Sequence, residues 1–164
     1  MPDSLLYGAP PETLRLLLGH ADFAAPWQIL GHLDAHLACQ RLPKLGHSIA
    51  EIVGHLHNNM LYNLDLIEGR AAPERPDWPP VKEQAWPTLA ADFLEVLELL
   101  LDYAQRPELL ERVVFPATAT EPGWTVGYKL TVNVAKHNAY HFGQIVILRQ
   151  LLGAWPGVPS ADQL

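Results

Sequence analysis

The sequence is poor in cysteine, in positive charge and in long apolar runs. Its single cysteine, Cys39, excludes an intrachain disulfide and indicates a reducing compartment, so we expect the cytoplasm. Eleven Lys and Arg residues stand against 18 Asp and Glu residues, and phosphate binding needs clustered basic side chains, so we expect no nucleic-acid partner. No apolar run is long enough to cross a bilayer, and the N-terminal residues do not resemble a signal peptide, so we expect no membrane partner.

Apolar residues, in contrast, are abundant. They make up 49% of the chain, whereas charged residues make up 18%, a balance that favours a folded core over disorder. The 164 residues fit one domain, predicted to span residues 1–164, which can bury about 70% of the surface of its unfolded chain.

Prolines divide the chain into segments whose apolar residues recur at helical spacing. A capping box, Ser48 with Glu51, marks one helix start, and Gly69 and Gly153 mark two helix ends. We predict four long helices, over residues 27–41, 48–68, 88–105 and 126–152. One short helix, over residues 12–18, precedes them.

The fold class predicted from these segments is all-α. No segment alternates at period two, although residues 108–115 are ambiguous, and four long helices suggest a four-helix bundle. The Pro-rich segment 71–87 is too long for a tight turn, so we expect a crossover that lets the second and third helices lie parallel or non-adjacent.

The last predicted helix carries two histidines on one face. His137 and His141 are four residues apart, and they share a mainly apolar stripe with Gln144. Such a pair is most often a set of core histidines that hydrogen-bond to the backbone or to water. A third histidine nearby would favour a metal ion instead, because buried imidazoles need a common partner and neutral imidazole binds divalent metals well.

The second predicted helix offers two candidates for that third ligand. His55 and His57 both lie at the edges of its apolar arc, on opposite sides. His55 falls beside Asn59 and Tyr62, and a polar cluster at the margin of an apolar arc resembles a site more than the surroundings of His57 do. The helical wheel therefore favours His55 without excluding His57.

Other candidate groups give weaker signals. His32 and His36 are also four apart, and we interpret them as surface or interface histidines of the first predicted helix. Cys39 could be a nucleophile only if its pKa were lowered, and nothing in the sequence indicates this, so we interpret it as a small buried residue. Nucleotide-binding loops, a nucleophile elbow and a His-Glu-x-x-His motif are missing from the sequence.

Two stretches of the sequence resemble one known family. The run HNAYHFGQIVILR at residues 137–149, followed by LGAWP at 152–156, is similar to the last helix of the DinB-like superfamily. The run HSIAEIVGHL at 47–56 is similar to that family's second helix, in which a histidine follows the capping serine by seven residues. This register selects His55 over His57.

The resemblance implies an up-down-down-up four-helix bundle of the DinB/YfiT type, often dimeric, with one divalent metal ion (zinc, nickel or manganese) held by His55, His137 and His141. Characterised relatives include S-transferases that use bacillithiol or mycothiol. By this analogy we expect a low-molecular-weight-thiol S-transferase acting on a small-molecule substrate. Asn59, Tyr140 and Gln144 are then the candidates for orienting substrate or ligating imidazoles.

Two alternatives to the transferase stay open. One is a metal-dependent hydrolase, because a metal ion with three protein ligands keeps a coordination position for water. The other is a non-catalytic metal-binding or stress-related bundle. The five tryptophans, and the apolar segment around Trp78 and Trp86, further predict a homodimer, because a small monomer hides so much aromatic surface poorly.

Overall fold

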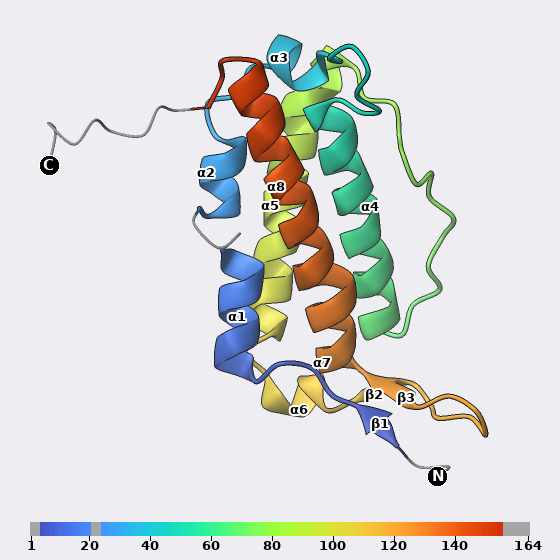
Figure 1. Cartoon of the computed structure of the whole chain (residues 1–164). Helices are drawn as coiled ribbons and strands as arrows, with labels where there is room; N and C mark the ends of the chain where they lie inside the picture. The colour runs from blue at the N-terminus through green and yellow to red at the C-terminus, as the bar shows by residue number, and fades with distance from the viewer. Residues whose placement is uncertain (1–3, 21–23, 156–164) are drawn as a thin grey trace, which may run out of the picture.

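The computed structural model describes residues 4–20 and 24–155, and most of its regular structure is helical (Figure 1). Its helices are α1 (Pro11–Gly19), α2 (Pro26–Leu30), α3 (Ala35–Cys39), α4 (Ile49–Ile67), the 3-10 turn η1 (Glu83–Ala85), α5 (Trp86–Tyr103), α6 (Pro107–Leu110), α7 (Val126–Lys129), the π-helix η2 (Leu130–Ala135) and α8 (Lys136–Leu151). Three short strands accompany them, β1 (Leu5–Leu6), β2 (Val113–Phe115) and β3 (Gly123–Thr125). Within these described ranges, no helix is both long and apolar enough to cross a membrane.

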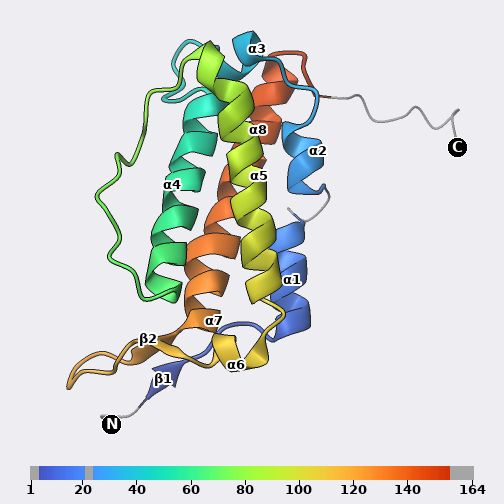
Figure 2. The same ribbon diagram turned by 180° about the vertical axis from the view of Figure 1, so that it is seen from behind.

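The long helices lie side by side, and the path of the chain between them is unusual. In Figures 1 and 2, α4 and α5 both start at the end of the bundle that carries α3, and both finish near the small sheet. The connection between them, residues 68–82, returns along the outer side of α4. The helical run from α7 to α8 travels in the opposite direction, so α8 lies antiparallel to α4.

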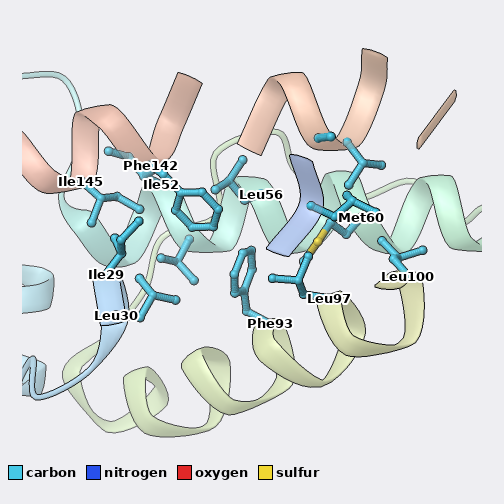
Figure 3. Close-up of a cluster of buried hydrophobic side chains, with 14 of the residues drawn as sticks. Ile29, Leu30, Ile52, Leu56, Met60, Phe93, Leu97, Leu100, Phe142 and Ile145 are labelled. Carbon is cyan, nitrogen blue, oxygen red and sulfur yellow. The ribbon is translucent and has the colours of Figure 1, made fainter. Parts of the chain in front are cut away.

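The core forms where α2, α4, α5 and α8 meet, and Figure 3 shows its middle. Phe93 and Phe142 pack edge to face there, with ring centroids 6.0 Å apart and planes at 88°. Each apolar side chain buried in this way stabilises the fold by roughly 1.5–3 kcal/mol. This apolar layer holds α4 against α8, the two helices that carry the histidines of interest.

The sequence-based helix bounds hold for α4 and α5. The predicted capping box is present: Ser48 N donates to Glu51 Oε2 at 2.9 Å, and Ser48 Oγ accepts from Glu51 N at 3.3 Å. Gly69 and Gly153 adopt positive φ angles of 72° and 66° just beyond α4 and α8. These are the conformations expected of glycines that end helices.

The prediction of one helix over residues 27–41 is wrong. The segment forms α2 and α3 with a turn between them, in which His32 takes a positive φ of 55°. Asp34 starts α3 by accepting a hydrogen bond from Leu37 N at 2.8 Å. Its side chain competes with continuous helix for backbone hydrogen bonds, and this preference for capping explains the break.

The all-α prediction is correct for the bulk of the chain but missed the small sheet. β3 lies in the middle, parallel to β1 and antiparallel to β2, at the end of the bundle opposite α3. The strands have two or three residues each, which is too short to display an alternating pattern.

The predicted final helix over 126–152 is a continuous helical run, but its middle is not α-helical. The six residues of η2 form a π-helix between α7 and α8, and it ends two residues before His137. π-Helical turns are uncommon and are frequent at functional sites. Here the wider turn changes the rotation of α7 relative to the histidine-bearing face of α8.

Candidate metal centre

Three histidines from α4 and α8 meet at one point. His55 Nε2 lies 3.0 Å from His137 Nε2, and His141 Nε2 lies 3.1 Å from the same atom. All three nitrogens lie within 4.8 Å of one another. The structure thus brings together the three residues proposed as metal ligands.

Local helix geometry explains why these three side chains converge. His137 and His141 are one turn apart on α8, so their rings lie on the same face, where they meet edge to face. His55 stands on the side of α4 that faces α8, between the core residues Ile52 and Leu56. Because the apolar layer fixes the contact between the two helices, it also fixes the approach of the three rings.

The Nδ1 atoms of two of these histidines have acceptors as partners. His55 Nδ1 lies 2.8 Å from the backbone oxygen of Asp77 and 3.0 Å from its carboxylate Oδ1. His141 Nδ1 lies 2.7 Å from Gln144 Oε1. These oxygens accept hydrogen bonds and cannot donate, so Nδ1 carries the hydrogen in both rings and Nε2 carries a lone pair.

This proton arrangement leaves too many lone pairs at the meeting point. His137 Nε2 can donate at most one hydrogen, yet it faces the lone-pair nitrogens of both other rings. At least one of the two short Nε2 contacts therefore has no hydrogen between its atoms. A cation at the centre resolves this conflict by accepting all three lone pairs.

Protonation of the rings is a poor alternative to a metal ion. Burial, followed by repulsion from His141 and His55, lowers the pKa of His137 to about 4. Burial also lowers the pKa of His141. His137 and His141 are therefore favoured as neutral imidazoles at neutral pH, which is the form that binds metals.

The spacing of the donors fits one divalent ion. Nitrogens bound at roughly 2.0–2.1 Å to one tetrahedral zinc ion lie about 3.3 Å apart. The two contacts of 3.0 and 3.1 Å are close to that separation, and small ring rotations would match it. The three-histidine group could thus hold a metal ion with few changes in geometry.

The other residues singled out from the sequence take different positions. Gln144 contacts His141 directly, as described, whereas Asn59 links α4 to η2 by donating to Asn133 O at 2.7 Å. Tyr140 is 66% exposed, and its ring meets the edge of His141 at 5.0 Å. Tyr62 is also exposed; it packs against Lys129 and lines a hollow together with His55 and His137.

Three other histidines and Cys39 lie apart from this group. His57 points to a different hollow, lined by Gly54, Pro79 and Leu89, and burial lowers its pKa. His32 and His36 are exposed, and His36 Nδ1 lies 3.1 Å from Glu83 Oε1. Burial, with the nearby carboxylates of Glu83 and Glu51, raises the pKa of Cys39, so this thiol is not activated.

Sequence reasoning missed the contribution of the Pro-rich crossover. Besides the Asp77 contacts, the crossover supplies Trp78, whose indole stacks on His55 with centroids 4.1 Å apart and planes at 11°. The same indole stacks on His47 at 3.7 Å. The aromatic and acidic side chains of this segment were visible in the sequence, but no local pattern relates them to a histidine 22 residues away.

Two of the tryptophans that suggested a homodimer are covered, fully or in part, by other residues of the same chain. Trp86 is buried inside the chain and donates from Nε1 to Leu33 O at 3.0 Å. Trp78 is half-buried by the two imidazoles on which it stacks. The fold itself therefore accommodates both residues, and the dimer stays a prediction.

Comparison with known proteins agrees with this geometry. A family model described as the DinB superfamily matches residues 9–145. The chain belongs to the DinB superfamily. No curated protein matches the chain. The family assignment predicted from residues 47–56 and 137–156 is confirmed, and together with the three-histidine group it fits a metal-binding protein.

Proposed function

We propose that this DinB-superfamily chain is a divalent-metal-dependent enzyme that transfers a low-molecular-weight thiol, such as bacillithiol or mycothiol, to an electrophilic small molecule. The convergence of three imidazole Nε2 atoms, two of which carry a lone pair because Asp77 and Gln144 accept from Nδ1, is the observation that carries the proposal. Three neutral imidazoles leave the charge of an ion uncompensated and leave coordination positions free, as in catalytic metal sites.

The bound ion would supply a positive charge that lowers the pKa of a thiol placed beside it. The side chains around it have separate tasks in the proposal. Asp77 and Gln144 orient His55 and His141 through their Nδ1 atoms, as hydrogen-bond partners of metal-ligating histidines commonly do. Tyr140, which is exposed beside His141, contacts the substrate, and Asn59 holds α4 and η2 in register next to His137.

The proposed reaction joins a thiol and an electrophile with loss of a leaving group. The thiol releases its proton to solvent, and its sulfur lone pair forms a bond to the electrophilic carbon. The bond from that carbon to the leaving group breaks, and the leaving group departs with the electron pair and takes up a proton. The role of the chain is to position both reactants and to keep the sulfur deprotonated.

A metal-reconstituted protein tests the proposal directly. We expect it to conjugate bacillithiol or mycothiol to a panel of alkylating and arylating electrophiles, and we expect His141→Ala to lose bound metal and conjugation together. His57→Ala, which removes a half-buried histidine outside the centre, is the matched control and should keep both.

Two results would contradict the proposal of a thiol transferase. If the loaded protein conjugates no thiol but cleaves esters or amides, the hydrolase replaces it. If the metal-free protein conjugates as fast as the loaded protein, the ion takes no part in the chemistry.

Two structural expectations belong to the same proposal. One is that the bundle has the up-down-down-up order of the family, with residues 1–164 acting as a single domain. The other is that the active form is a homodimer, which sedimentation at micromolar concentration would test against an 18.2 kDa monomer.

A further inference from the structure

We propose that an apolar hollow beside His141 is the binding site for an uncharged alkyl or aryl group of the second substrate. The hollow has a volume of about 380 Å³, within the range of roughly 300–1,000 Å³ found for small-molecule sites. Its apolar lining comes from the loop before α4, the crossover, α4 and α8, namely Leu45, Ile52, Trp78, Tyr140, Ile147 and Leu148.

The polarity of this hollow differs from that of its neighbours. No Asp, Glu, Lys or Arg is among the described residues that line it. The hollow beside His137 includes Lys136 with Asn59 and Asn133, and the one shared by His55 and His137 includes Arg75 and Asp77. The three-histidine centre therefore has an uncharged side at His141 and charged sides at the other two ligands.

The lack of charged side chains in this hollow determines which kind of chemical group it can bind. An ionised group placed against the apolar lining, away from the ion, would lose water without gaining a counter-charge from Asp, Glu, Lys or Arg, which is costly. An alkyl or aryl group gains contact with Ile147 and Leu148 instead. Charged parts of a thiol, such as carboxylates, find Lys136 or Arg75 on the other sides. We therefore assign the hollow to the electrophile, an inference that rests on the proposed function for the identity of the reaction.

The aromatic rings around His141 give the hollow a direct link to the centre. Trp78 meets the edge of His141 at 5.8 Å with planes at 74°, and Tyr140 meets it at 5.0 Å with planes at 78°. Trp78 also stacks on His55. A flat group between these rings would lie next to an imidazole that the proposed function assigns to the metal.

A second copy of this chain is the rival occupant of the same face. Ile147 and Leu151 are 57% and 61% exposed and lie one turn apart on α8. Ile147 lines the hollow, but Leu151 does not. This difference supplies a matched pair of substitutions, because a flat interface between copies would use both residues and a small-molecule site would use only the first.

The probe for the test is N-phenyl-1-naphthylamine, an uncharged aryl amine that fluoresces in apolar sites, titrated into the metal-loaded protein. Its anionic relative 8-anilino-1-naphthalenesulfonate has the same rings. We expect the uncharged probe to bind more tightly, and Ile147→Glu to weaken it by roughly tenfold or more, because a charge then faces an apolar group. Leu151→Glu should change its dissociation constant by less than about twofold.

Each outcome decides between the inferences. Equal weakening by both substitutions, together with dissociation of a dimer, assigns the face to a second copy and overturns the inference. Unchanged probe binding in Ile147→Glu also overturns it, even if thiol conjugation is intact. If Ile147→Glu weakens the probe as expected while no thiol is conjugated to any electrophile, the apolar site stands and the proposed reaction falls.

Discussion

Two pairs of histidines in this chain have the same spacing in sequence but lie in different environments. His137 and His141 share one face of α8, and their Nε2 atoms lie 3.1 Å apart. His32 and His36 have the same separation in sequence, but a turn before Asp34 divides them and both are exposed. Spacing alone therefore does not make a ligand pair. A continuous helix that carries both rings on its buried face is also needed.

The largest expected effect comes from removing one imidazole of the buried pair. His137→Ala takes away the nitrogen that contacts both other ligands, so metal affinity should fall by more than the roughly 10–100-fold typical of losing a ligand's hydrogen-bond partner. Metal content after dialysis against a weak chelator measures the effect. His36→Ala is the control from the exposed pair, and a similar loss there would remove the distinction between the pairs.

The next largest effect on metal affinity should come from removing Gln144 Oε1, the acceptor for His141 Nδ1. Gln144→Leu should weaken metal binding by about tenfold or more, because His141 loses the oxygen that fixes its tautomer. Gln144→Glu keeps an acceptor and should retain most of the affinity. Asp77→Asn should have the smallest effect of the three, since the backbone oxygen of residue 77 still faces His55. Competition titrations with a zinc indicator would rank the variants.

Acid should lower the unfolding free energy of the metal-free protein, because His137 resists protonation in the folded chain. The pKa of His137 is lowered from 6.5 to about 4, so the unfolded chain takes up a proton over this range and the folded chain does not. Stability is therefore complete above about pH 6.5, falls as the pH drops, and levels off for this group below about pH 4. The partly exposed ring should contribute about 1–2 kcal/mol.

Urea unfolding of the metal-free protein between pH 7 and pH 4 measures this loss. His137→Gln removes the titrating ring and should flatten the dependence on pH. An equally steep dependence in that variant would show that other groups cause the loss.

The smallest effect concerns the turn that separates His32 from His36. Asp34→Ala removes the cap of α3, which should cost about 1 kcal/mol of unfolding free energy. Metal affinity should stay unchanged, because α3 contributes no ligand to the centre. Thermal unfolding with and without added zinc separates the two quantities, and a coupled loss of metal would mean that α3 supports the site.

The sequence was sufficient to predict which three histidines converge but not what surrounds them. Helical spacing paired His137 with His141, and the family register selected His55. The contacts of Asp77 and Trp78 depend on how the crossover lies along α4, which is a tertiary feature without a local pattern. The π-helix was also missed, because it repeats no sequence motif. The break in the helix predicted over residues 27–41 could have been found from the sequence, because aspartate at position 34 strongly favours a helix N-cap.

The most direct test of the account is a crystal structure of the zinc-loaded protein with anomalous data at the zinc edge. We expect one strong peak per chain within about 2.0–2.3 Å of the Nε2 atoms of His55, His137 and His141, with each ring bound through Nε2. A peak at the exposed histidines instead, or none between the three imidazoles, would contradict the assignment of this centre to a metal ion.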